Sequence, residues 1–172
     1  MKRILSVAAS FLVTLGTSLS FAQTDADNLY KSTLVNMKKV SFSNQYKMKV
    51  AGNLFLPKDM KAGEKYPAII VGHPMGAVKE QSANLYATKM AERGFVTLAI
   101  DLSFWGESEG EPRNTVSPEI YAEDFSAAVD FLGTRPFVDR NRIGVIGICG
   151  SAISAPFHAT WIGEEYKFRI IY

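Results

Sequence analysis

The sequence is short of cysteine and histidine, with a single cysteine, Cys149, and two histidines among its 172 residues. One cysteine cannot form a disulfide within the chain, which excludes a cross-linked scaffold. Beyond residue 22, no apolar run approaches the roughly 20 residues that span a bilayer. The 19 basic and 17 acidic residues are interspersed, which excludes a basic face for nucleic acid or anionic lipid. With 47% hydrophobic residues, the chain is instead long and apolar enough for one globular domain.

Residues 1–22 have the pattern of a cleaved signal peptide. Two basic residues precede an uncharged stretch rich in Leu, Val and Ala, and Ser20 and Ala22 place small residues before a cleavage site at Gln23. The alternative is an uncleaved anchor, but the stretch contains too many hydroxyl groups for one, and no cysteine follows it for lipid attachment. We expect an exported, periplasmic or extracellular protein that does not touch the membrane after cleavage, with residues 23–36 as a flexible lead-in.

Strands and helices alternate over residues 37–172. The patterns predict two leading strands at 40–42 and 46–56, buried strands at 66–72, 95–100 and 142–148, and helices at 79–93 and 120–132. Alternation of this kind predicts an α/β fold, a doubly wound and mostly parallel sheet with right-handed crossovers.

The most informative motif joins the last buried strand to a helix: Gly147-Ile148-Cys149-Gly150-Ser151. Small residues on both sides of Cys149 allow a sharp strand-to-helix turn, which lifts a nucleophile above the sheet. A thiol at a helix N-terminus is also favoured as the thiolate. The alternative is a buried structural cysteine after an apolar strand. We predict a turn in which the sulfur of Cys149 faces the loop from His73 to Gly76.

That loop, His73-Pro74-Met75-Gly76, follows the first buried strand. A loop in this place can supply one backbone N–H to an oxyanion hole, and the residue after the nucleophile supplies the other. Proline has no N–H, so Met75 or Gly76 is the first candidate donor and Gly150 is the second. An ordinary strand-to-helix turn would have a similar composition.

A second loop runs from Asp101 to Gly110 after the next strand, where ligand sites of parallel sheets are built. Phe104 and Trp105 are candidates for lining a substrate pocket, although they could equally pack the loop onto the body. Asp101 is expected to brace the loop by accepting backbone hydrogen bonds rather than to act in catalysis.

These segments together resemble the α/β-hydrolase superfamily, and more narrowly its dienelactone-hydrolase-like exported members. The resemblance rests on the Gly72–Gly76 loop with Lys79-Glu80-Gln81, on Ser103–Ser108 with Glu111-Pro112-Arg113, and on the Cys149 motif. It implies a Cys or Ser nucleophile that acts with a histidine base and an acid on ester, thioester or lactone bonds. It implies a small ester-like substrate. His73, Phe104 and Trp105 are the candidate substrate-binding residues, although the resemblance gives His73 a structural role in its loop. No metal or cofactor is expected.

The chain departs from this pattern after Cys149, because the acid and the histidine of such enzymes follow on later strands. His158 would lie about 13 Å along the helix that begins at the turn, too far to act as the base. Pro156 would break that helix. We therefore expect a C-terminally truncated or frameshifted hydrolase domain with little activity, or else a divergent short family member. A non-catalytic binding domain and a redox-responsive thiol protein remain alternatives.

The signal peptide is directly testable. Exported protein should begin at Gln23, because a signal peptidase cuts after small residues such as Ala22. N-terminal sequencing of secreted or periplasmic material measures this, and recovery of Met1 from exported protein would contradict the prediction.

Overall fold

The computed structural model describes residues 30–152 and 170–171. Along the chain these residues form the elements β1 (Val35–Ser43), β2 (Lys49–Pro57), β3 (Tyr66–Gly72), α1 (Ser82–Ala91), β4 (Val96–Ile100), α2 (Pro118–Gly133), β5 (Val138–Gly147) and β6 (Ile170–Ile171). The strands form one sheet in the order β1-β2-β4-β3-β5-β6. Strands β4, β3, β5 and β6 are parallel, while β1 and β2 are added antiparallel at one edge. The predicted doubly wound, mostly parallel sheet is confirmed.

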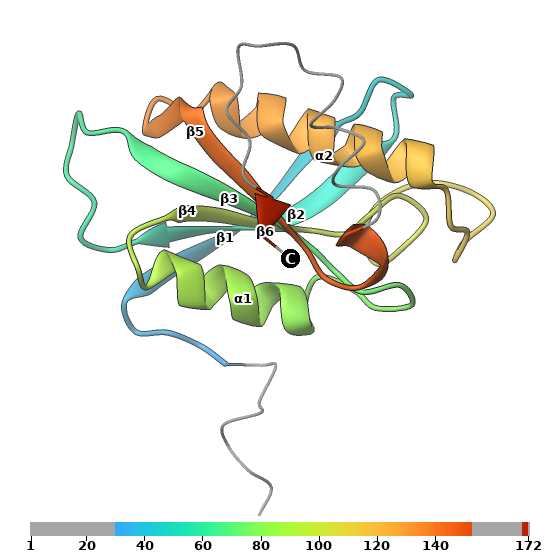
Figure 1. Cartoon of the computed structure of the whole chain (residues 1–172), viewed down its shortest axis with the longest axis horizontal. Helices are drawn as coiled ribbons and strands as arrows, with labels where there is room; N and C mark the ends of the chain where they lie inside the picture. The colour runs from blue at the N-terminus through green and yellow to red at the C-terminus, as the bar shows by residue number, and fades with distance from the viewer. Residues whose placement is uncertain (1–29, 153–169, 172) are drawn as a thin grey trace, which may run out of the picture.

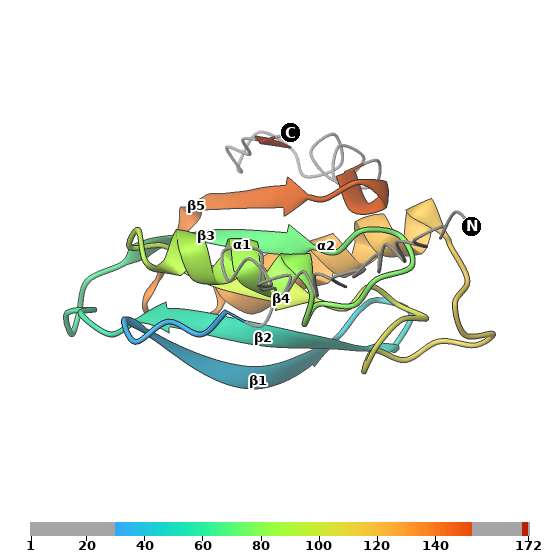
Figure 2. The same ribbon diagram turned by 90° about the horizontal axis from the view of Figure 1, so that it is seen from below.

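Helices α1 and α2 cover opposite faces of the sheet (Figure 1), and Figure 2 shows the strands following one another in the sheet order. Each face has its own apolar cluster. Under α2, the large side chains of Phe125 and Leu132 fill the space above the strands. Under α1, the buried apolar positions of the helix are all small: Ala83, Ala87 and Ala91. The alanines let α1 lie close to the sheet, which fixes the loop that leads into this helix.

Several boundaries differ from those expected. Strand β1 begins at Val35, within the segment expected to be a flexible lead-in. Strand β5 begins at Val138, because this residue pairs with Tyr66 before a bulge shifts the register. Helix α1 is shorter at its N-terminus because the backbone turns at Gln81, whose N–H donates to the Val78 carbonyl at 3.1 Å. The proposed helix break at Pro156 lies outside the described residues.

The part of the chain that the structure describes contains no helix long and apolar enough to cross a membrane.

A buried carboxylate on α2 ties distant parts of the fold together. Asp124 has no exposed surface, and it accepts hydrogen bonds from the Ser103 N–H at 2.7 Å, the Ser103 hydroxyl at 2.8 Å and the Asn44 amide at 2.9 Å. Asn44 belongs to the turn between β1 and β2, and Ser103 to the loop after β4. Burial raises the pKa of Asp124 to about 6, although the three hydrogen bonds oppose the shift.

The raised pKa predicts a pH dependence of stability. A carboxyl whose pKa is higher in the folded than in the unfolded state stabilises the fold when protonated, and this contribution is lost as the pH rises through the folded pKa. The free energy of unfolding of the native chain minus that of Asp124→Asn should therefore fall by about 2 kcal/mol between pH 4 and pH 7. Urea unfolding of both proteins measures it, and the titration of His73, common to both, cancels. A difference that is flat or rises with pH would contradict the prediction.

Candidate active site

Cys149 lies at the turn between β5 and a helical segment that begins at Gly150, as predicted. Its backbone has a φ of 55°, which non-glycine residues seldom adopt. A side chain held in this conformation between strand and helix is typical of the nucleophile turn of hydrolases. The thiol is exposed. The alternative of a buried structural cysteine is therefore wrong.

The turn depends on glycines because backbones meet closely around it. A Cβ on Gly147 would lie 2.5 Å from the Cα of Ala152, a backbone atom that cannot swing aside. A Cβ on Gly72, at the end of β3, would lie 2.8 Å from the hydroxyl oxygen of Ser151. That hydroxyl accepts a hydrogen bond from the Ile148 N–H at 2.8 Å, so Ser151 is fixed across the turn. Serine is accommodated at this position because its hydroxyl has a partner inside the turn.

The loop after β3 forms a tight turn beside Cys149. The Ala77 N–H donates to the Pro74 carbonyl at 3.1 Å, and Gly76 has a φ of 76°, as the third residue of a type II turn requires. A Cβ on Gly150 would lie 3.3 Å from the Met75 nitrogen, so the two segments are in contact. Within residues 30–152, the N–H groups of Met75 and Gly76 donate no hydrogen bond.

His73 lies under this loop rather than in an open site. Its Nε2 accepts a hydrogen bond from the Leu102 N–H at 3.1 Å, which places the ring proton on Nδ1, 2.7 Å from the Pro74 carbonyl oxygen. Burial lowers its pKa, although the Pro74 carbonyl favours the charged form. With both ring nitrogens engaged and 1% of its surface exposed, His73 braces the loop. These contacts agree with the structural role that the family resemblance gives His73, and its contact with substrate stays a prediction.

Phe104 and Trp105 also pack the second loop onto the body. Phe104 is 6% exposed and belongs to the apolar cluster under α2. The Trp105 indole N–H lies 2.6 Å from the Tyr121 hydroxyl and 3.1 Å from the Thr115 carbonyl, and its ring meets His73 edge-on. These contacts support the loop-packing alternative for both aromatics, and their role in substrate binding stays a prediction.

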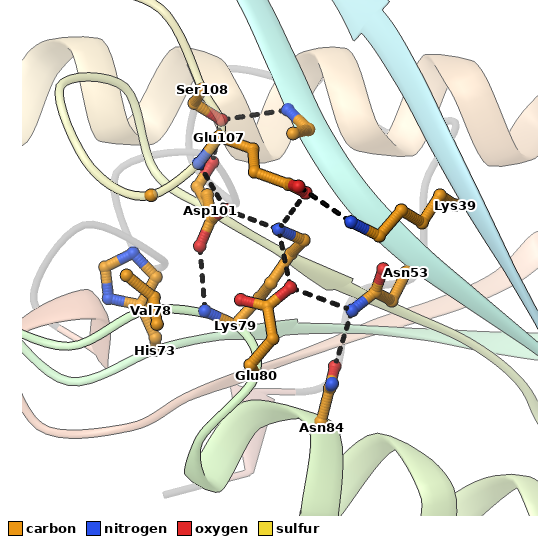
Figure 3. A network of polar contacts seen from close by, with 12 residues as sticks. Lys39, Asn53, His73, Val78, Lys79, Glu80, Asn84, Asp101, Glu107 and Ser108 are labelled. Atoms are coloured by element: carbon orange, nitrogen blue, oxygen red, sulfur yellow. Dashed lines mark hydrogen bonds and ion pairs between the residues drawn. The ribbon is translucent and has the colours of Figure 1, made fainter.

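Asp101 braces the loops as predicted, but its main partner, Lys79, was not anticipated. The Lys79 N–H donates to one carboxylate oxygen at 2.8 Å, and the Lys79 ammonium lies 2.6 Å from the other (Figure 3). The Glu107 N–H also donates to Asp101, at 2.9 Å. Both Lys79 and Asp101 have no exposed surface. Lysine in a polar stretch is normally solvated, so the sequence offers no signal of this burial beyond the family motif that contains it.

The Lys79 ammonium meets three carboxylates in all. It lies 2.8 Å from Glu80 and 2.8 Å from Glu107, and Glu107 also pairs with Lys39 at 2.7 Å. Burial opposes the charge of Lys79, but the hydrogen bonds to Asp101, Glu107 and Glu80 outweigh it and raise its pKa above the usual value. The hydrogen bonds from Lys39 and then Lys79 lower the pKa of Glu107 to about 2. Lys79 and Glu107 are therefore both charged at neutral pH.

The described residues contain no group of three or more His, Cys, Asp or Glu side chains that could hold a metal ion. His158 lies outside the described residues.

The sheet topology and the nucleophile turn beside a backbone-donor loop define the chain as an α/β-hydrolase. Among hydrolases of this fold it belongs to the dienelactone hydrolase family, whose model matches residues 50–163.

Several relatives are similar over the same region. Uncharacterized protein PA2218 of Pseudomonas aeruginosa is 60% identical over 119 residues, which cover 69% of this chain and 32% of the relative. Its crystal structure superposes with a TM-score of 0.77 at 49% identity, covering 87% of this chain and 46% of that one. Uncharacterized protein YcjY of Escherichia coli is 47% identical, covering 66% of this chain and 38% of the relative. Thiohydrolase aneE of Aspergillus aculeatus is 36% identical, covering 68% and 35%. The chain thus spans about a third of the length of these curated relatives.

The close approach at Gly147 predicts the effect of a single methyl group. Gly147→Ala should destabilise the chain by roughly 1–3 kcal/mol, because the new Cβ meets backbone rather than a movable side chain. Gly133→Ala, at the end of α2, is the control. The atom nearest to its new Cβ is the Cγ of the flexible Arg140 side chain, at 3.3 Å. Thermal and urea unfolding compare the two variants. Equal stabilities would show that the turn can relax around a larger residue.

Proposed function

We propose that this chain carries the nucleophile and the oxyanion-stabilising loop of a cysteine-dependent hydrolase. The substrate class is a small molecule with an ester, thioester or lactone bond. The observation that supports it best is the exposed Cys149 thiol at a backbone φ of 55°, next to the contact between Gly150 and Met75. The thiohydrolase name of one relative agrees with a carbonyl substrate that carries a sulfur leaving group. We also propose export, with cleavage before Gln23.

In the proposed reaction, the Cys149 thiolate attacks the carbonyl carbon of the substrate. The negative charge that develops on the carbonyl oxygen is met by the N–H of Gly150 and by that of Met75 or Gly76. The carbon–oxygen or carbon–sulfur bond to the leaving group then breaks, and the leaving group takes up the proton released by the thiol. An acyl group remains on the sulfur as a thioester.

Deacylation requires a base that activates water, and general acid–base assistance is worth about 10²–10⁴-fold. Among the described residues His73 is the one histidine, and its ring nitrogens are occupied by Leu102 and Pro74. We therefore propose that the 172-residue chain is acylated at Cys149 and then turns over slowly.

The proposal predicts a stoichiometric burst. With p-nitrophenyl acetate, the chain should release about one equivalent of p-nitrophenol and then stall, with an acetyl group on Cys149. Absorbance follows the burst, and mass spectrometry of the digested protein locates the acetyl group.

Cys149→Ala is the control and should release p-nitrophenol no faster than buffer. Acetylation of lysines without Cys149 would contradict the proposal. A thiol that ignores the ester but is oxidised by dilute hydrogen peroxide would favour the redox alternative.

A further inference from the structure

We propose that Lys79 is a positioning residue for the oxyanion-stabilising loop, defined as residues 73–79. By binding Asp101 with both its backbone N–H and its ammonium, Lys79 fixes the end of this loop that is remote from β3. The N–H groups of Met75 and Gly76 are thereby held beside the Cys149 turn. This inference rests on the proposed function, because it concerns acyl transfer at Cys149.

The two ends of the loop bind two neighbouring residues of the chain, one end to Leu102 and the other to Asp101. At the first end, the His73 ring accepts from the Leu102 N–H at 3.1 Å. At the other end, Lys79 binds Asp101 through its N–H at 2.8 Å and its ammonium at 2.6 Å. Asp101 and Leu102 directly follow β4, which lies between β2 and β3 inside the sheet. The loop is therefore attached to residues that follow a strand paired on both sides.

Within the described part of the chain, the middle of the loop makes no hydrogen bond to a strand of the sheet. Its internal hydrogen bond, from the Ala77 N–H to the Pro74 carbonyl, closes the turn but does not attach it to the sheet. Met75 is 54% exposed and contacts Gly150. The position of the turn relative to Cys149 thus depends on the two ends.

Stability alone does not explain a charged pair in this place. Apolar residues of similar volume often replace a buried ion pair without loss of stability. An apolar residue would not, however, connect one carboxylate to both the side chain and the backbone of residue 79. The ion pair between Lys79 and Asp101 therefore fixes the position of the loop. Position matters because a misplacement of about 1 Å at a reacting centre can cost about 100-fold in rate.

The experiment compares two reactions of the Cys149 thiol in folded protein. Acylation by p-nitrophenyl acetate uses the oxyanion-stabilising N–H groups, whereas alkylation by iodoacetamide generates no oxyanion and does not use them. Lys79→Met should slow acylation about 100-fold while alkylation changes by less than about threefold.

Lys39→Met is the matched control. It removes an ammonium that contacts the same Glu107 carboxylate at 2.7 Å, from a side chain that is 64% exposed and outside the loop. Both rates should stay at the native values. Because Lys79→Met leaves the buried Asp101 carboxylate unpaired, the double variant Lys79→Met/Asp101→Asn, which removes both charges, is measured alongside and should show the same selective loss.

Three results would overturn the inference: native acylation in a folded Lys79→Met, an equal loss of acylation and alkylation, or failure of both Lys79 variants to fold. The last two would make Lys79 a residue of general structural importance. Failure of the proposed function is separate, because the native chain would then react with iodoacetamide but not with the ester.

Discussion

A carboxylate without solvent contact must find its hydrogen-bond donors within the protein, and at Asp101 this requirement organises the whole end of the sheet. Lys79 approaches from the loop after β3 and the Glu107 N–H from the loop after β4. Ser108 extends the arrangement to β2, because its hydroxyl donates to the Asp101 carbonyl and accepts from the Ala51 N–H. Two loops and a strand therefore meet at Asp101 (Figure 3).

Close backbone packing around Cys149 is a second constraint on the site, besides the ion pair between Lys79 and Asp101. The strand-to-helix turn brings Gly147 within contact distance of the Ala152 backbone, and the same crowding reaches Gly72 through Ser151. Gly147 and Gly72 have no room for a side chain. Cys149 has a strained positive φ, and its thiol is exposed. A backbone this constrained holds the Cys149 side chain in one place, and the glycines that constrain it have no functional group of their own. The site is thus built mainly from backbone geometry.

The described part of the chain contains some of the elements expected of a hydrolase site but no histidine that is free to act as a base. It contains the strand-to-helix turn at Cys149 and the loop after β3, to which we assign the nucleophile and the N–H groups that would stabilise charge on a carbonyl oxygen. Its one histidine, His73, supports the loop and is kept neutral by burial among backbone partners. The curated relatives are about three times as long as the region they share with this chain. Family membership therefore shows the fold, while the activity of the whole protein depends on segments beyond the shared region that we do not assign.

The order of strands and helices and the place of Cys149 follow from the sequence, because buried parallel strands are continuous apolar runs and sharp turns need glycine. The roles of His73, Phe104 and Lys79 do not. Each is decided by partners that lie far along the chain: Leu102 for His73, the cluster under α2 for Phe104, and Asp101 for Lys79. Whether a polar side chain is solvated or buried depends on the groups that the fold brings to it, and a local pattern contains no record of them.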